Sequence, residues 1–411
     1  MSESSDQHYV IVGAGQAGAE VASELRKRGF EGQISLIGDE PVAPYRRPPL
    51  SKAYFSGDAE ADSLLVLKPP QLEKNGIDLL SGVTVDAIDR ATHTVTLSDG
   101  RSLQYDKLAL TTGGRARPLP CPGNDLDGVF LLRSLADVDA IRAHCNAETR
   151  MAIVGGGFIG LEVAASARKA GMAVTVVETL DRVLARVTAP VVSAFFERIH
   201  REAGVDLRTG VRVEAIEGTT KVEGVRLGDG SVIPADVVVV GIGLIPNVEL
   251  AEAAGLEVDN GIVVDACAQT SDPDIVAAGD CANHPNRFAG ERIRLESVQN
   301  AMEQARVAAG TMLGAESPYD AVPWFWSDQY DCKLQMAGLS VGYDDIVLRG
   351  DPAAEKRFSA FYLRDGQLIA ADSVGRPQDF MFAKKLVTLN IAPDRAKLAD
   401  PEVPLKAFLP A

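Results

Sequence analysis

The chain has 411 residues, of which 46% are apolar and 24% charged, as is typical of a globular protein long enough to form two or three domains. A single small binding module is therefore excluded. The net charge of −16 argues against surfaces built for phosphate backbones or anionic lipids, so we expect no nucleic acid and no membrane as partner. Residues 1–8 hold no apolar segment, the five cysteines are widely spaced, and the five histidines are scattered. We therefore expect a cytoplasmic protein with no disulfide framework and no metal site.

The first predicted elements form a nucleotide-binding unit at the start of the chain. Residues 9–12 are a short apolar strand, followed by the glycine-rich segment 13–18 and a helical stretch that ends near Arg28. A second strand is expected over residues 33–37, with Asp39 directly after it. This order of strand, glycine-rich turn, helix, strand and acid is the βαβ pattern of a dinucleotide site.

The same pattern returns in the middle of the chain. Residues 151–154 form an apolar strand, residues 155–160 repeat the glycine-rich segment, and a helix is expected to about Ala170. The second strand, over residues 173–177, ends at Glu178. One glycine motif is weak evidence, whereas two complete copies strongly favour two Rossmann-type nucleotide-binding domains.

Each residue type in this pattern has a physical role. The first glycine allows a tight turn, the second lets a phosphate approach the backbone, and the third lets the helix pack closely on the strand. The helix N-terminus offers free N–H groups and the positive end of its dipole to a pyrophosphate. Asp39 and Glu178 are expected to accept hydrogen bonds from an adenosine ribose.

Two further segments indicate where one domain interrupts another. Residues 108–114 are a strand that enters a turn of small residues, and residues 275–280 are a strand that ends in Gly-Asp. These two segments flank the second βαβ unit. They favour an α/β protein in which one Rossmann-type domain is inserted into another, followed by a small α+β domain. The expected boundaries are 1–112 with 246–322 for the FAD-binding domain, 113–245 for the inserted NAD-binding domain and 323–411 for the α+β domain.

Cysteines are missing where thiol chemistry would need them. Flavoenzymes that reduce disulfides carry a cysteine pair after the first nucleotide unit or within the second one. The corresponding segments, 44–52 and 151–245, contain no cysteine. Cys281 stands alone and is best explained as a small buried residue. Redox chemistry through a thiolate is therefore not indicated.

Several longer segments carry a resemblance that covers nearly the whole chain. They are residues 45–52, 155–164, 241–247, 270–273 and 323–330. The last is the most specific, because it holds both tryptophans of the chain, two positions apart. With these motifs the sequence resembles the NADH-dependent ferredoxin reductases of bacterial oxygenase systems, the putidaredoxin reductase type.

The resemblance implies FAD as the bound cofactor. The corresponding contacts in this chain are Gly13, Gly15, Ala17, Gly18, Asp39, Arg46, Lys52, Val85, Arg133, Asp280 and Val298. Without the resemblance, Arg46 and Arg133 would be explained equally well as solvated surface charges. Val85 and Val298 would be ordinary core residues.

The resemblance also implies NADH as the reductant. The corresponding contacts are Gly155, Gly157, Gly160 and Glu178. Phe158 stands where the family often has a tyrosine, so an aromatic ring is kept without its hydroxyl. The family further implies that Lys52 and Glu162 pair near the flavin. A carboxylate at Glu178 repels a 2′-phosphate and so favours NADH over NADPH, although two arginines, Arg182 and Arg186, lie nearby.

The activity implied is electron transfer from NADH through FAD to a 2Fe–2S ferredoxin that feeds a cytochrome monooxygenase or a ring-hydroxylating dioxygenase. Lys52, Glu162, Phe158 and Trp326 would carry it, with Trp326 facing the flavin on the ferredoxin side. Trp324 and Trp326 lie two apart on a predicted strand and should point the same way, so packing at a domain boundary is the alternative for both. A rubredoxin reductase, or an NADH-responsive flavoprotein of the apoptosis-inducing-factor kind, remains a second interpretation.

Charge predicts where the ferredoxin docks. Residues 331–411 contain eleven basic and eleven acidic side chains, so the net charge lies entirely in the rest of the chain. The resemblance implies an acidic ferredoxin, which should dock on the least acidic face. The predicted contacts around Trp326 are Arg306, Lys333, Lys384, Lys385 and Lys406. For each of them an ordinary solvated side chain is the alternative.

Overall fold

The computed structural model describes residues 6–410, and their contacts divide the chain into two compact units. Unit 1 comprises the described part of residues 1–46 together with 62–115 and 245–323. Unit 2 comprises residues 47–61, 116–244 and 324 onward. Residues 116–244 thus interrupt unit 1 along the chain. The predicted boundaries of three domains are not decided by this division and stay a prediction.

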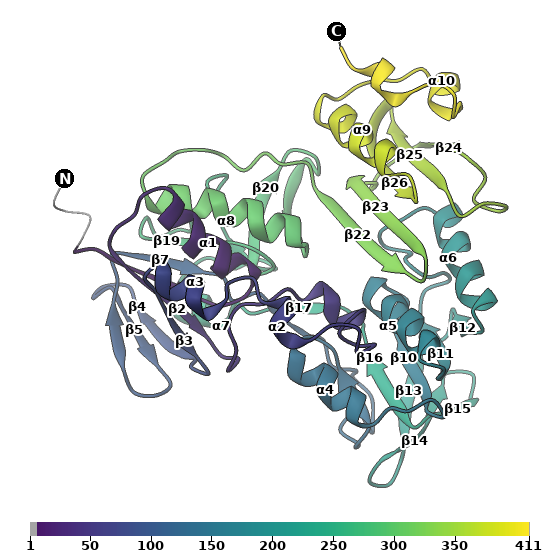
Figure 1. The fold of residues 1–411 in the computed structure, drawn as a ribbon, viewed down its shortest axis with the longest axis horizontal. Coiled ribbons are helices and arrows are strands. Elements are labelled where there is room, and N and C mark those ends of the chain that lie inside the picture. Colours follow the sequence, from purple (N-terminus) through teal and green to yellow (C-terminus); the bar gives the residue numbers. More distant parts are fainter. Residues whose placement is uncertain (1–5, 411) are drawn as a thin grey trace. The chain divides into compact units, whose positions relative to one another are not determined.

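The centre of unit 1 is a parallel sheet with the strand order β19-β7-β1-β2-β3 (Figure 1). The strands are β1 (His8–Val12), β2 (Gln33–Gly38), β3 (Ile77–Ser81), β7 (Lys107–Leu110) and β19 (Ile275–Ala277). Strands β1, β2, β7 and β19 are almost entirely buried because apolar residues follow one another without alternation, as parallel strands covered on both faces require. The strands predicted over residues 9–12 and 33–37 are confirmed.

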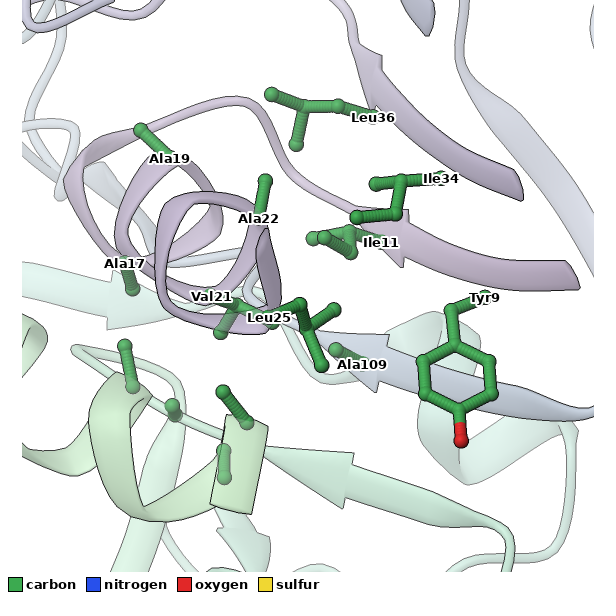
Figure 2. Packing of buried hydrophobic residues seen from close by; sticks show 14 of the residues in the cluster. Tyr9, Ile11, Ala17, Ala19, Val21, Ala22, Leu25, Ile34, Leu36 and Ala109 are labelled. Atoms are coloured by element: carbon green, nitrogen blue, oxygen red, sulfur yellow. The ribbon is translucent and has the colours of Figure 1, made fainter. Parts of the chain in front are cut away.

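Two helices, α1 (Gln16–Lys27) and α8 (Val298–Met312), pack on this sheet. Figure 2 shows Ala22 and Leu25 of α1 pointing toward the strand residues Ile11 and Ile34, and all four are fully buried. The α8 residues in the same core are mostly alanines, and such short side chains let the two helices approach closely. The packing holds the loop between β1 and α1 in one position.

Smaller elements complete unit 1. One antiparallel sheet consists of β4 (Val85–Asp89), β5 (Thr94–Leu97) and β6 (Ser102–Gln104). A second small sheet consists of β18 (Ile262–Val263), β20 (Ala282–Asn286) and β21 (Glu291–Arg294). The short helices are α3 (Pro69–Lys74) and α7 (Glu249–Ala253). At the borders of the units lie α2 (Ala61–Leu64), β8 (Gly114–Ala116) and β17 (Leu244–Pro246).

Unit 2 contains a second parallel sheet of the same kind, with the order β12-β11-β10-β16-β9. Its strands are β9 (Val129–Leu131), β10 (Arg150–Val154), β11 (Ala173–Glu178), β12 (Asp206–Thr209) and β16 (Val237–Val240). The helices of this part are α4 (Leu135–Ala143), α5 (Phe158–Lys169) and α6 (Pro190–Glu202), and a short 3-10 helix η1 (Pro48–Ser51) packs on α5. An antiparallel sheet is formed by β13 (Val213–Gly218), β14 (Val222–Leu227) and β15 (Val232–Pro234).

The end of the chain forms an antiparallel sheet with the order β22-β23-β26-β25-β24. Its strands are β22 (Trp324–Gln329), β23 (Cys332–Gly338), β24 (Asp345–Arg349), β25 (Phe358–Arg364) and β26 (Gln367–Val374). Helix α9 (Pro377–Thr388) packs on β26 and β23, followed by α10 (Arg395–Ala399) and η2 (Leu405–Phe408). The predicted fold class, two Rossmann-type parts followed by an α+β part, is confirmed. None of the helices described in residues 6–410 is long and apolar enough to span a bilayer.

Candidate functional site

The first glycine-rich loop has the shape of a phosphate cradle. Gly13 has φ +109°, and a Cβ there would lie 2.2 Å from the carbonyl oxygen of Thr111. A Cβ on Gly18 would lie 2.0 Å from the carbonyl oxygen of Gly13, whereas a Cβ on Gly15 would meet nothing within 4 Å. Gly15 is also the N-cap of α1, and no side chain caps the helix there. Open space therefore lies beside an uncapped helix N-terminus, which suits a pyrophosphate.

The second loop repeats this geometry in unit 2. Gly155 has φ +112°, and its Cβ would lie 2.3 Å from the carbonyl oxygen of Gly241. A Cβ on Gly160 would lie 2.0 Å from the carbonyl oxygen of Gly155, while Gly157, the uncapped N-cap of α5, faces open space. The two loops therefore fit the same kind of group, the diphosphate of a dinucleotide.

Glu178 ends β11 with its carboxylate held from both sides. Its Oε2 accepts a hydrogen bond from the Gly156 backbone N–H at 2.7 Å, and its Oε1 accepts one from Leu180 at 2.8 Å. Arg182 turns inward and donates to the Thr188 and Ala185 carbonyls and to the hydroxyl of Ser193. Its guanidinium is thus already engaged within the protein and does not offset the charge of Glu178.

The remaining nucleotide contacts predicted in unit 1 lie on several elements. Asp39 follows β2 and is exposed, and the exposed Arg46 donates to the Ser63 carbonyl at 2.7 Å. Val85 begins β4 and Val298 begins α8. Asp280 follows β19, beside Gly279, whose N–H donates to Gln304. The roles of these residues toward a nucleotide stay predictions, as do those of Ala17 and Gly18.

A buried ion pair joins Lys52 and Glu162 in unit 2. Lys52 directly follows η1, and its Nζ lies 2.6 Å from Oε2 of Glu162 and 3.2 Å from the Pro48 carbonyl oxygen. Glu162 lies one turn into α5 and is 2% exposed. The resemblance implied this pair, and the structure shows its contacts within unit 2.

Two serines that the sequence analysis did not single out complete the contacts of Glu162. Ser51 donates to Oε2 at 2.5 Å, and Ser327 of β22 donates to Oε1 at 2.6 Å. Both side chains are buried. The signal for Ser327 was the alternation of β22, because a polar residue beside Trp326 must face away from the tryptophan.

The aromatic residues of β22 divide between its two faces. The Trp324 and Trp326 rings lie 5.6 Å apart, and Trp324 also contacts Phe380 of α9 at 5.7 Å. Phe325 instead packs against Phe158, the first residue of α5, with ring centroids 4.7 Å apart. The prediction that both tryptophans point the same way is confirmed. That Trp326 faces the flavin, and that Phe158 stacks over it, stay predictions.

Other predicted residues are placed as follows. Arg133 lies in unit 2, where its N–H donates to Asp137 at the start of α4 and its carbonyl accepts from Arg47. All five cysteines are free, and Cys281 is fully buried, as expected for a small core residue. Within residues 6–410 there is no group of side chains that could hold a metal ion.

The predicted docking residues are partly engaged within the protein. Arg306 of unit 1 pairs with Glu20 at 2.7 Å, and Lys333 of unit 2 lies 3.9 Å from Asp328. Lys384 lies over the Trp324 ring, 5.6 Å from its centroid. Lys406 is an exposed residue of η2.

Comparison with known proteins places the whole chain in two protein families. Residues 7–305 match the pyridine nucleotide-disulphide oxidoreductase family and residues 324–409 match the reductase C-terminal family, so the chain belongs to these flavin-dependent oxidoreductases. Within them it belongs with the ferredoxin reductases of oxygenase systems, the group predicted from its motifs. Membership implies FAD as cofactor and NADH as reductant.

Individual relatives are similar over their full length. The chain is 50% identical to a putidaredoxin reductase of Pseudomonas putida, covering 99% of this chain and 97% of that protein. It is 49% identical to the ferredoxin reductase subunit of a 5,5′-dehydrodivanillate O-demethylase from Sphingobium, covering 98% of each. The crystal structure of a covalent putidaredoxin reductase–putidaredoxin complex matches with a TM-score of 0.95 at 50% identity, covering 98% of both chains.

Proposed function

We propose that this protein transfers electrons from NADH through FAD to a 2Fe–2S ferredoxin, which serves a cytochrome monooxygenase or a ring-hydroxylating dioxygenase in the cytoplasm. The observation that carries the proposal is the presence in one chain of two equivalent dinucleotide cradles, at Gly13 and at Gly155, together with the ion pair of Lys52 and Glu162. Electron transfer through a cysteine thiol has no support. Cys281, the cysteine nearest in sequence to a predicted FAD contact, is fully buried and is not part of a cysteine pair.

The two cradles would be used differently. We assign the loop at Gly13 to FAD because it opens the chain segment that leads through Asp39 to the motif of residues 45–52. The other FAD contacts of the proposal are Gly15, Ala17, Gly18, Arg46, Lys52, Val85, Arg133, Asp280 and Val298. The loop at Gly155 would hold NADH, with Glu178 at the adenosine ribose. When bound, FAD supplies the chemistry that accepts a hydride and releases electrons singly.

The residues of unit 2 would orient and stabilise the reacting groups. Lys52 provides a positive charge whose position is fixed by Glu162 and by the Pro48 carbonyl. A fixed cation stabilises negative charge that develops during hydride transfer, without the cost of reorienting water. Phe158 begins α5 beside the loop that would hold NADH, so its ring can cover the site and exclude water.

The ferredoxin is proposed to dock on the last part of the chain, around Trp326. Residues 331–411 carry no net charge, whereas the rest of the chain is strongly acidic. An acidic partner would therefore be repelled least there. The proposed contacts are Trp326, Lys333, Lys384, Lys385 and Lys406, with Arg306 as a contact from unit 1.

The experiment is a steady-state assay with the purified holoprotein, NADH, a 2Fe–2S ferredoxin and cytochrome c as the final acceptor. Rapid cytochrome c reduction only when the ferredoxin is present supports the proposal. Replacing the ferredoxin by a rubredoxin tests the closest alternative acceptor. NADH oxidation that no iron–sulfur or rubredoxin partner accelerates would contradict the proposal and favour a protein that binds NADH for another purpose.

A further inference from the structure

Glu162 is the end of a longer chain of buried hydrogen bonds in unit 2. Ser327, which donates to Glu162, is itself contacted by Nε2 of Gln329 at 3.1 Å. Oε1 of Gln329 lies 2.9 Å from Nε2 of His200 on α6, and Nδ1 of His200 lies 3.1 Å from the Tyr330 hydroxyl. The side chains of Ser327, Gln329 and His200 are fully buried, while Tyr330 is 37% exposed.

The directions of the first three hydrogen bonds in this chain follow from its end at Glu162. A carboxylate only accepts, so Ser327 must donate its hydroxyl proton to Glu162. The Ser327 oxygen then accepts from the amide NH₂ of Gln329, which turns the Gln329 oxygen toward His200. His200 must therefore donate from Nε2.

The ring of His200 is thereby fixed as the neutral tautomer with its proton on Nε2. Its Nδ1 carries no proton and accepts from the Tyr330 hydroxyl. Burial lowers the pKa of His200 to about 4, with the Gln329 hydrogen bond opposing that shift, so the ring is neutral at physiological pH. Each hydrogen bond of the chain is therefore donated in the same direction, from Tyr330 at the surface toward the buried Glu162.

The outer end of the chain lies on a strained turn. Tyr330 joins β22 to β23 with φ +55°, a strained conformation that bulky residues rarely adopt. Its ring packs edge-on against His200, with centroids 5.0 Å apart. The ring contact and the hydrogen bond thus both join this turn to α6.

We propose that Ser327, Gln329 and His200 are positioning residues that hold the Glu162 carboxylate, and through it the Lys52 ammonium, in the geometry used for hydride transfer. This inference rests on the proposed function, because it takes Lys52 to act at the flavin. The chain links β22, which carries Trp326, to α5, which begins at the NADH loop. The strand that would receive the ferredoxin and the helix that would hold NADH are therefore fixed by one set of hydrogen bonds.

The chain itself is tested by ¹⁵N NMR of the histidine rings in the holoprotein. His200 is assigned by the signals that vanish in His200→Gln. We expect the Nε2-protonated neutral tautomer at pH 7, and a shift of the Nε2 signal in Ser327→Ala, which removes the next acceptor along the chain. A protonated ring, or a proton on Nδ1 at pH 7, would overturn the assigned direction.

The positioning role is tested by stopped-flow reduction of the bound FAD with NADH. Ser327→Ala and His200→Phe should each slow reduction about tenfold while leaving the apparent Kd for NADH unchanged, because loss of one buried hydrogen bond is worth about one factor of ten. His200→Gln keeps an N–H donor toward Gln329 and should restore at least half of the wild-type rate. Ser359→Ala is the matched control, since it removes an equally buried hydroxyl that contacts Ser373 and Asp379 instead.

The outcomes separate the two proposals. Wild-type reduction rates in Ser327→Ala and His200→Phe would overturn the positioning role, although ferredoxin reduction by the wild-type protein would still stand. Equal slowing in Ser359→Ala would overturn it as well, because the effect would then be general destabilisation. If the wild-type protein fails to reduce a ferredoxin, the proposed function falls, while the tautomer of His200 still tests the chain.

Discussion

At the scale of single residues, Glu178 is predicted to set the preference for NADH over NADPH. Backbone N–H groups hold both of its carboxylate oxygens, so the charge cannot swing away from a 2′-phosphate. The like-charge contact should cost several kcal/mol, and we expect NADH to exceed NADPH by roughly 100-fold in kcat/KM. Steady-state kinetics with both cofactors measures this ratio. The variant Arg186→Ala is the control for the exposed arginine near Glu178. Comparable kcat/KM values for NADH and NADPH in the wild-type protein would contradict the role of Glu178.

Lys52 is the second residue whose substitution has a defined outcome. Lys52→Met leaves Glu162 buried without its counter-charge, and breaking such a pair from one side costs about 3 kcal/mol. We expect the variant to reduce FAD with NADH at a much lower rate, with a smaller effect on FAD affinity. Stopped-flow reduction and FAD titration compare the two. Lys169→Met, which removes an exposed lysine of α5 paired with Asp58, should leave both unchanged. Reduction at the wild-type rate in Lys52→Met would refute the prediction.

At the scale of elements, the alternation of β22 separates two sets of side chains. One face carries the tryptophans, and the other carries Phe325, Ser327 and Gln329, which contact α5 and α6. The face of β22 that carries Ser327 and Gln329 is occupied by buried polar contacts. The opposite face, which carries Trp326, is therefore the one that can meet a partner. The register of β22 is thus fixed from within unit 2.

Trp326→Ala tests this division of faces. We expect slower electron transfer to ferredoxin with unchanged FAD content and unchanged NADH-to-ferricyanide activity, because Trp326 lies on the face opposite to Ser327. Paired assays with the two acceptors measure the effect. Tyr343→Ala, at another half-exposed aromatic residue of the same part of the chain, is the control and should change neither activity. Loss of FAD from Trp326→Ala would mean that the ring supports the cofactor site instead.

Two buried titratable groups, His200 on α6 and Asp372 on β26, have opposite effects on how stability depends on pH. Burial lowers the pKa of His200 to about 4, so the unfolded chain binds the proton more tightly and stability falls as pH drops from 6.5 to 4. Burial raises the pKa of Asp372 to about 6, although Thr188 and Tyr362 donate to it, so stability falls as pH rises from 4 to 6. Each contribution is about 3 kcal/mol over its window.

The two slopes cancel between pH 4.5 and 6. We therefore expect the combined contribution of His200 and Asp372 to the free energy of unfolding of the wild-type protein to change little in this range. Asp372→Asn should make stability rise with pH in this window, and His200→Gln should make it fall. Urea unfolding at several pH values measures both slopes. If the slopes of the two variants have the same sign, the burial of one group has been assigned wrongly.

At the scale of the whole molecule, charge is distributed unevenly along the chain. The net charge of −16 lies outside residues 331–411, which carry equal numbers of basic and acidic side chains. Long-range repulsion between two acidic proteins should therefore orient an acidic ferredoxin toward the neutral part. This argument concerns association rate and salt dependence more than the strength of the final contact.

Lys406→Glu and Arg306→Glu test the orientation. Each should raise KM for ferredoxin and reduce its salt dependence, while NADH-to-ferricyanide activity stays unchanged. Lys406 gives the cleaner test, because Arg306 pairs with Glu20 and its reversal places two carboxylates together. Lys221→Glu, an exposed lysine before β14, is the control. Unchanged ferredoxin KM and salt dependence in both variants would place the docking face elsewhere.

The sequence by itself determined the repeated architecture and its cofactors. The two glycine motifs with their strands, helices and acids carry local information, because each pattern lies within one βαβ unit. The backbone atoms that crowd Gly13 and Gly155 belong instead to Thr111 and Gly241, which lie outside those units. The parallel strands followed from uninterrupted apolar runs such as residues 9–12. The family resemblance, carried by motifs such as residues 45–52 and 323–330, supplied the ferredoxin partner.

Apart from Lys52, whose pairing the resemblance implied, only the tertiary structure decided what surrounds Glu162. Its partners come from residues 51–52, from β22 and, through Gln329, from α6, and no spacing in the sequence connects these segments. A serine or a glutamine within a strand does not reveal in the sequence which group it will contact. Only the folded structure shows that Ser327 contacts the Glu162 carboxylate and that Gln329 contacts His200. The buried charge of Glu162 and the neutral ring of the buried His200 together therefore determined the direction of four hydrogen bonds. This information is non-local, because desolvation depends on every element packed around the group and not on its neighbours in the chain.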